Sequence, residues 1–399
     1  MKTYSEVITF LFKQYPNYQN KGAKAYKPDL SNITALSKII GNPHQKIKTI
    51  HVAGTNGKGS VCNYLGNIYI ENGYKVGVFT SPHLIDFGER ITINQKYISK
   101  EYIVDFYNRY LEEFKTVSPS FFEWSTVLAL KYFEDEKTDI NIIETGLGGR
   151  LDSTNIIQPE LSIITTVGRD HQNILGNTLY DIAKEKAGII KNGIPTLLGP
   201  DIKETKDVFE TVATENNSKL YQAIESETKS ENLPDYQLNN WETAYKATQI
   251  LDDEFPVKVN KENISKYLTI KGRWQVLSKN PKVVADIGHN AQGMASIKKQ
   301  IEKENFKKLH ILIGFSEDKN LMEILHYLPN ADFIYATQSS NERSVDSNEI
   351  GNLVKESECI CIDDYKVAFK ELIRKVNDQD LVLITGSAFL VGNILHDFY

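Results

Sequence analysis

Residues 54–60, with the sequence GTNGKGS, have the residue types and spacing that point most directly to chemistry. They lie between a β-branched run and an amphipathic run, a pattern that predicts a strand, a tight turn and a helix. In such a turn, backbone N–H groups face an anion and the helix dipole strengthens the attraction. Lys58 would then reach the outer phosphates of a nucleotide, and the Ser60 hydroxyl is placed to hold Mg²⁺.

The match to the general phosphate-loop pattern is imperfect. Val52 stands where the pattern has its first glycine, and Gly59 intervenes before the hydroxyl. A glycine-rich turn with a surface lysine is the alternative interpretation. The position between a strand and a helix favours the nucleotide interpretation.

Three further polar residues lie at or just beyond the ends of neighbouring predicted strands, namely Ser81, Glu144 and His171. Ligands of open parallel sheets bind outside the carboxyl ends of the strands, so these side chains are expected at one edge with the loop. A hydroxyl and a carboxylate beside phosphate oxygens suit Mg²⁺, whereas the imidazole leaves Mn²⁺ open. Each also has an ordinary interpretation: a turn residue before proline, an exposed strand end and a structural histidine.

Strand and helix patterns alternate along most of the chain, which predicts an α/β protein with parallel sheets covered on both faces. A domain boundary is expected near 270–280, where the alternation restarts. Residues 223–238 are polar and are expected to form a loop. The expected strands are 47–53, 75–80, 140–144, 161–167, 282–286, 308–314, 332–337, 359–362 and 381–385, and the clearest expected helices are 5–15, 30–40, 58–72, 124–136, 178–187, 241–251 and 365–376.

Composition excludes several classes of protein. With 399 residues, 41% hydrophobic and 25% charged, the chain is long and apolar enough for two or three globular domains. A net charge of −6 without a basic block argues against nucleic-acid binding, and no apolar run is long enough for a membrane span. Three cysteines make no disulfide framework, so a cytoplasmic setting is expected. Cys359 and Cys361 lie in a predicted strand, and we expect their thiols to face opposite sides.

Longer segments resemble a known family. They include HVAGTNGKGS (51–60), TSPHL (80–84), ETGLGGRLDSTN (144–155), VGRDHQNILGNTLYDIAKEKAGIIK (167–191) and DIGHN (286–290). In these segments the chain resembles folylpolyglutamate synthase/dihydrofolate synthase, a branch of the Mur-type ATP-dependent amide ligases. The resemblance implies an N-terminal P-loop ATPase domain over 1–275 and a smaller C-terminal Rossmann-like α/β domain over 276–399.

The resemblance also implies a reaction and its site. ATP would phosphorylate a substrate carboxylate, and L-glutamate would attack the acyl phosphate; the acceptors would be dihydropteroate or reduced folates. A planar pterin suits aromatic stacking with a carboxylate at its ring nitrogens. The implied roles are phosphate binding for Asn56, Gly57, Lys58 and Gly59 (with Ser60 from the loop pattern), Mg²⁺ binding for Ser81, Glu144 and His171, ATP contacts from the domain junction for Asn240, Arg273 and Asp286, and a pterin-side pocket for Phe122, Glu123, Arg150 and Asp152.

Two residues gain a catalytic interpretation only from the resemblance. Lys186 matches a lysine that the family carries as a carbamate, an anion able to hold a second metal. On its residue type and helix alone it is expected to be a solvated lysine. His289 is expected at the end of the first strand of the second domain, and would meet the acyl phosphate if the domains close.

For Arg273, the alternative to an ATP contact is a salt bridge at the hinge between the two domains.

Two other functions stay open. One is a Mur-type ligase acting on a UDP-muramyl precursor, against which the FFEWST (121–126) and GLGGRLDSTN (146–155) segments argue. The other is a P-loop kinase or ATPase with an appended binding domain, which would hydrolyse ATP without glutamate. Small-molecule substrates and a monomer, without nucleic acid or membrane partners, are the expected setting.

Overall fold

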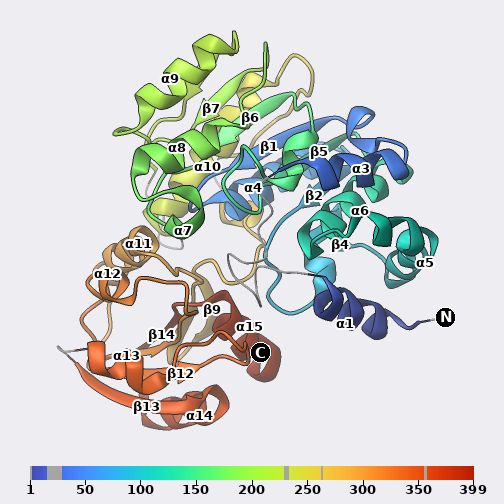
Figure 1. Cartoon of the computed structure of the whole chain (residues 1–399). Coiled ribbons are helices and arrows are strands. Elements are labelled where there is room, and N and C mark those ends of the chain that lie inside the picture. The colour runs from blue at the N-terminus through green and yellow to red at the C-terminus, as the bar shows by residue number, and fades with distance from the viewer. Residues whose placement is uncertain (1, 16–28, 229–232, 262–263, 355–356) are drawn as a thin grey trace. The chain divides into compact units, whose positions relative to one another are not determined.

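The computed structural model describes residues 2–15, 29–228, 233–261, 264–354 and 357–399 (Figure 1). Contacts between residues divide the chain into two compact units. The first consists of Met1–Gly168, Gln172–Lys229 and Tyr236–Thr269, and the second of Arg169–His171, Ser230–Asp235 and Ile270–Tyr399. Each unit has a sheet of its own, and the predicted α/β class is confirmed.

The first unit has an eight-stranded sheet in the order β4-β3-β2-β5-β1-β6-β7-β8. The strands from β2 to β8 in this order run parallel, and β3 and β4 add an antiparallel edge. The central strands are buried along their whole length, as β-branched runs covered on both faces should be. The strands are β1 (Thr49–Ala53), β2 (Val76–Phe79), β3 (Ile91–Ile93), β4 (Lys96–Tyr97), β5 (Ile140–Glu144), β6 (Leu161–Ile164), β7 (Thr196–Leu198) and β8 (Leu220–Gln222).

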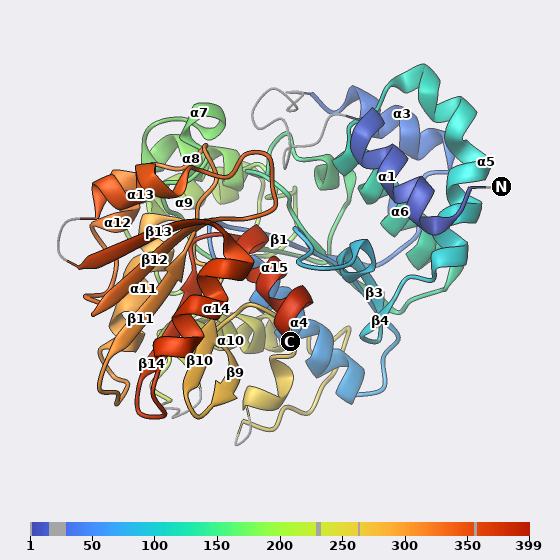
Figure 2. The ribbon, with the colours of Figure 1, turned by 90° about the horizontal axis from the view of Figure 1, so that it is seen from below.

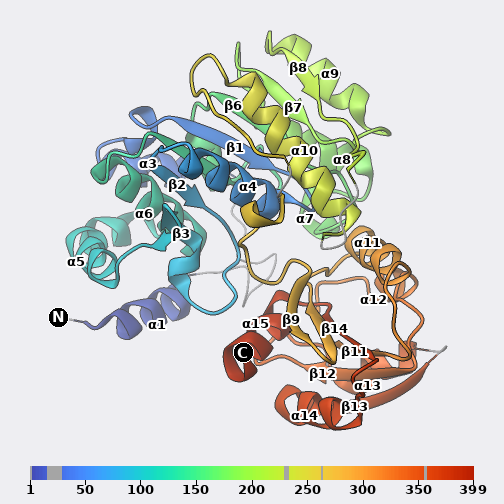
Figure 3. The same ribbon diagram turned by 180° about the vertical axis from the view of Figure 1, so that it is seen from behind.

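Helices cover both faces of this sheet, and Figure 3 shows α4 and α10 side by side on one of them. Tyr64 of α4 meets Trp241 of α10 edge to face, with ring centroids 5.5 Å apart. The expected loop over 223–238 is partly wrong, because α10 already begins at Asp235. The helices are α1 (Tyr4–Gln14), α3 (Ser31–Ile39), α4 (Lys58–Glu71), α5 (Lys100–Val117), α6 (Phe121–Asp135), α7 (Gln172–Leu175), α8 (Leu179–Ala187), α9 (Lys206–Glu215) and α10 (Asp235–Ile250), with short 3₁₀ turns η2 (Pro43–Gln45), η3 (Phe87–Arg90), η4 (Ser153–Ile156) and η5 (Ile264–Tyr267).

The second unit is a Rossmann-like sheet in the order β13-β12-β11-β14-β10-β9, parallel except for β9. The predicted first strand is β10, and the antiparallel β9 before it was not predicted. Figure 2 shows α14 and α15 in front of the strands. The elements are β9 (Gln275–Lys279), β10 (Lys282–Ala285), β11 (Leu309–Ile313), β12 (Phe333–Gln338), β13 (Glu358–Asp364), β14 (Leu381–Thr385), α11 (Ala291–Ile301), α12 (Leu321–Leu325), α13 (Ser347–Leu353), α14 (Tyr365–Lys375) and α15 (Ala388–Phe398).

The prediction that Cys359 and Cys361 face opposite sides of their strand is wrong. Residues two apart in a strand share a side, because side chains alternate with a period of two. Both sulfurs lie toward Gly351 of α13, where an added Cβ would come 2.4 Å from Cys361 Sγ and 3.7 Å from Cys359 Sγ. Both are free thiols.

None of the helices in the described parts of the chain is long and apolar enough to cross a membrane.

Candidate active site

The loop between β1 and α4 is packed so closely that a side chain at either of two glycine positions would clash with its neighbours. Gly57 has φ of +85°, and a Cβ there would come 2.3 Å from Asn240 Oδ1. A Cβ on Gly54 would come 1.9 Å from Thr165 Oγ1. Contacts this short leave no room for a side chain, so the backbone itself forms the surface of the loop.

The end of β6 holds the loop in place. Asn56 N donates to Thr166 Oγ1 at 2.9 Å, and Asn56 O accepts from Thr165 Oγ1 at 2.6 Å. Thr55 Oγ1 donates to Gly168 O at 3.0 Å. Neither Thr165 nor Thr166 was predicted to contact the loop, although two hydroxyl side chains directly after a buried strand could have indicated such a contact.

Lys58 is folded back onto its own loop. Its Nζ donates to Gly54 O at 3.0 Å and to Thr55 O at 3.2 Å. The N-cap of α4 is Gly57, which supplies no side-chain cap, so the first N–H groups of the helix are left for another acceptor. A cationic side chain beside uncapped backbone donors fits a phosphate group.

Ser60 and Asn240 are both held by α10. The Ser60 hydroxyl is fully buried and accepts from Gln237 Nε2 at 3.1 Å, so it faces this helix. Asn240 Nδ2 donates to Gln237 Oε1 at 3.2 Å, and Asn240 lies against Gly57. Asn240, expected to contact ATP from the domain junction, belongs to the first unit, and its ATP contact stays a prediction.

Ser81 and Glu144 meet at the ends of β2 and β5, which are parallel neighbours. Glu144 is 3% exposed, and its Oε2 accepts from Ser81 N at 2.9 Å. A buried carboxylate and a hydroxyl-bearing residue thus lie together, a donor set that fits a hard cation. Within the described residues no three His, Cys, Asp or Glu side chains cluster as metal ligands, and the full set with His171 stays a prediction.

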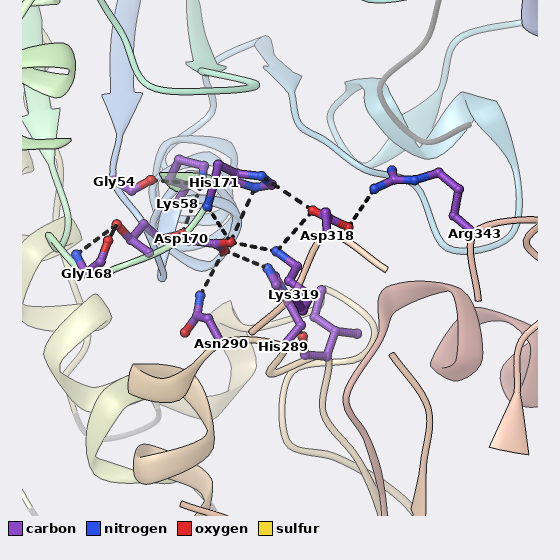
Figure 4. A network of polar contacts seen from close by, with 12 residues as sticks. Gly54, Lys58, Gly168, Asp170, His171, His289, Asn290, Asp318, Lys319 and Arg343 are labelled. Carbon is purple, nitrogen blue, oxygen red and sulfur yellow. Dashed lines mark hydrogen bonds and ion pairs between the residues drawn. The ribbon is translucent and has the colours of Figure 1, made fainter. Parts of the chain in front are cut away.

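His171 belongs to the second unit, in the polar network of Figure 4. Its Nε2 lies 3.7 Å from Asp170 Oδ1 and its Nδ1 lies 3.8 Å from Asp318 Oδ2. Burial lowers the pKa of His171 to about 3, against the pull of Asp170. A neutral imidazole is the form that can bind a metal.

Asp170 is the centre of that network. Its carboxylate lies 2.6 Å from Lys319 Nζ and 3.2 Å from His289 Nε2, and it accepts from Asn290 Nδ2 at 3.1 Å. Burial alone would raise the pKa of Asp170, but the charge of Lys319, followed by the interaction with His171 and the hydrogen bond with His289, holds it well below its usual range. His289, predicted to be catalytic, is therefore held by a carboxylate that sequence reasoning did not single out.

Asp286 and Arg273 have local partners in the second unit. Asp286 is 5% exposed and accepts from Trp274 N at 2.8 Å and from Gly288 N at 2.9 Å. Arg273 Nη1 donates to Gly272 O at 3.3 Å. The carboxylate thus fixes the turn that precedes β9, and the ATP contacts stay predictions.

The four predicted pterin-side residues have definite places in the first unit. Phe122 lies against Gly146, where a Cβ would come 2.6 Å from its Cζ. Glu123 is buried and forms a capping box with Ser120 at the start of α6. This helix begins at Phe121, three residues before its expected start. Asp152 is buried and accepts from Leu147 N at 2.8 Å; burial raises its pKa despite this bond. Arg150 pairs with Glu185 at 2.7 Å.

Lys186, on the last turn of α8, is only 2% exposed. The expectation of a solvated helix lysine is therefore wrong. Lysine is almost never fully buried unless something compensates its charge. Its burial singles it out as a functional candidate.

Comparisons with known proteins agree with this architecture. Residues 52–260 match the Mur ligase middle domain, and residues 272–388 match the Mur ligase glutamate ligase domain. The chain is 33% identical to the dihydrofolate synthase/folylpolyglutamate synthase of Bacillus subtilis, over 92% of this chain and 94% of the relative.

Solved structures are similar over nearly the whole chain. The folylpolyglutamate synthase of Thermotoga maritima is 31% identical, with a TM-score of 0.78 over 99% of this chain and 97% of that one. A bifunctional folylpolyglutamate synthase/dihydrofolate synthase with Mn, AMPPNP and L-glutamate bound is 26% identical, with a TM-score of 0.85 over 99% and 98%. Together with the phosphate-type loop and the paired Ser81 and Glu144, these matches show that the chain belongs to the dihydrofolate synthase/folylpolyglutamate synthase branch of the Mur ligases and is an ATP-dependent ligase.

Proposed function

We propose that this protein joins the amino group of L-glutamate to the carboxylate of dihydropteroate, of a reduced folate, or of both, with ATP as the energy source. The observation that supports it best is the loop before α4, whose glycines touch Asn240 and Thr165 and whose helix start has no side-chain cap. A similar enzyme binds AMPPNP and L-glutamate. UDP-muramyl substrates and plain ATP hydrolysis are the rival functions.

The loop residues bind and orient the nucleotide. Asn56, Gly57, Lys58 and Gly59 would surround the phosphates, with Lys58 turning from its loop carbonyls toward them. Ser81, Glu144 and His171 would hold Mg²⁺ or Mn²⁺, which neutralises phosphate charge. Phosphoryl transfer depends mainly on such positioning and charge neutralisation. The acyl phosphate is then open to the glutamate amine.

The other predicted residues complete the proposal. Buried Lys186, as a carbamate, would supply negative charge beside the metal, and His289 would stabilise charge on the acyl phosphate. Asn240, Arg273 and Asp286 would contact ATP, and the pterin would lie near Phe122, Glu123, Arg150 and Asp152. The domains would be 1–275 and 276–399, in a cytoplasmic monomer.

One assay separates the three functions: phosphate release with ATP, L-glutamate and either dihydropteroate, a reduced folate or a UDP-muramyl acceptor. We expect glutamate-dependent release only with a pterin acceptor. Release only with the muramyl compound would assign a cell-wall substrate, and release independent of glutamate would indicate an ATPase.

A further inference from the structure

One asparagine joins the end of α8 to the loop that follows Glu144. Asn155, in η4, is 7% exposed, and its Nδ2 donates to Arg150 O and to Gly188 O, both at 2.9 Å. Its Oδ1 is buried without a hydrogen-bond partner among the described residues. The side chain therefore stabilises the structure through its two donors, each directed at one of the two segments.

Glu185 joins the same two segments a second time. Arg150 N donates to Glu185 O at 2.7 Å, and the Arg150 Nε and Nη2 atoms lie 3.0 and 2.7 Å from Glu185 Oε1. The surroundings are tight, since a Cβ on Gly149 would come 2.8 Å from Glu185 O and one on Gly188 would come 2.3 Å from Arg150 Cβ. The two segments consequently have little freedom to shift against each other.

These are the segments that carry Lys186 and follow Glu144. Lys186 is next to Glu185 on the last turn of α8, and the loop begins directly after the Glu144 carboxylate. We propose that Asn155 and Glu185 are positioning residues that fix Lys186 relative to Glu144. This inference rests on the proposed function, in which both of those side chains act at the reacting phosphate.

A near-isosteric variant tests the inference. Asn155→Asp keeps the size of the side chain but replaces the Nδ2 amide group, which donates both hydrogen bonds, by a carboxylate oxygen. That oxygen would face the carbonyl oxygens of Arg150 and Gly188, and their repulsion should push the two segments apart. Misplacement of about 1 Å can lower turnover about 100-fold. Asn141→Asp is the matched control: Asn141 is fully buried, its Nδ2 donates to Lys48 O at 2.9 Å, and it lies near the start of β5, whose last residue is Glu144.

The experiment measures four properties of each variant: turnover, KM for ATP, unfolding in urea, and the affinity of its AMPPNP complex for Mn²⁺. For Asn155→Asp we expect kcat to fall at least about tenfold with KM for ATP within about threefold, and Mn²⁺ binding to weaken. Asn141→Asp should lose similar stability and keep kcat within about twofold. Equal losses of kcat in both variants would show a structural role only and overturn the proposal.

Glu185→Gln is the second variant, for the case that Asn155→Asp does not fold. It keeps the backbone carbonyl that Arg150 N uses and weakens only the side-chain pair. A fall in kcat without loss of stability supports the proposal, and an unchanged kcat overturns it. If the wild-type protein shows no glutamate-dependent phosphate release, the proposed function fails, and Mn²⁺ affinity of the variants still decides whether Asn155 positions the site.

Discussion

At the scale of single residues, burial distinguishes two of the proposed site residues from ordinary surface lysines and glutamates. Lys186 and Glu144 are 2% and 3% exposed, whereas most lysines and glutamates lie on the surface. The residue types and their spacing in the sequence predicted a role for Glu144. No sequence pattern could show that Lys186 is buried, because α8 presents it like any other residue of an amphipathic helix. In the sequence, only the family resemblance singled out Lys186.

Lys58→Ala should lower kcat at least about 100-fold, since stabilisation of transition-state charge by one group is worth about 3 kcal/mol. The measurement is phosphate release at saturating ATP and glutamate, with Lys13→Ala, an exposed lysine of α1, as the control. Turnover within about threefold of wild type in a folded Lys58→Ala protein would contradict the phosphate assignment.

Glu144→Gln should raise the Mg²⁺ concentration needed for half-maximal activity, because a neutral amide is a weaker ligand for a hard cation than a carboxylate. Activity is titrated with MgCl₂ at fixed ATP. Glu136→Gln, an exposed glutamate, serves as the control. An unchanged Mg²⁺ titration would remove Glu144 from the metal site.

At the scale of elements, alternating strand and helix patterns predicted the parallel strands well. The strand 140–144 was predicted to the residue, because buried β-branched runs bounded by turns are distinctive. β3, β4, β7, β8 and β9 were missed, being two to five residues long and partly polar. The Asp170 network was missed because its partners come from segments far apart in sequence, and only folding brings them together.

The two ends of α4 offer a matched pair of glycine substitutions. Gly57 has φ of +85° with Asn240 Oδ1 in the way of a Cβ, whereas Gly73 has φ of +88° with nothing within 4 Å. Both changes to alanine should cost about 1 kcal/mol of backbone strain. Gly57→Ala should also weaken ADP binding at least about tenfold by displacing the loop, and Gly73→Ala should not. Calorimetric titration with ADP measures this, and equal affinities in the two variants would contradict the role of the loop.

At the scale of the whole molecule, one buried histidine should make the free energy of unfolding depend on pH. His51 is fully buried, and its Nε2 lies 2.8 Å from Thr154 Oγ1. Burial, with the nearby charge of Lys191, lowers the pKa of His51 to about 3. The unfolded chain binds a proton at this histidine below about pH 6.5, whereas the folded chain does not until about pH 3, so stability is lost as the pH falls through that window.

His51→Gln removes this titration and can still donate to Thr154. Its free energy of unfolding should therefore fall less steeply below pH 6, by about 1.4 kcal/mol per pH unit relative to wild type. Urea unfolding at several pH values from 4.5 to about 7.5 measures both slopes. Parallel slopes in the two proteins would show that His51 is protonated equally in the folded and unfolded chains.

The packing of α10 against the glycine loop also has a consequence for biosynthesis. The motif of residues 54–60 ends at Ser60, but the helix whose Asn240 and Gln237 complete its surroundings begins only at Asp235. On the ribosome, the loop therefore leaves the exit tunnel long before its partner helix has been translated. A nascent chain that ends before α10 holds every residue of the phosphate motif, yet it lacks the amide side chains that pack against the motif. We therefore expect nucleotide binding to strengthen only after the later part of the message has been translated.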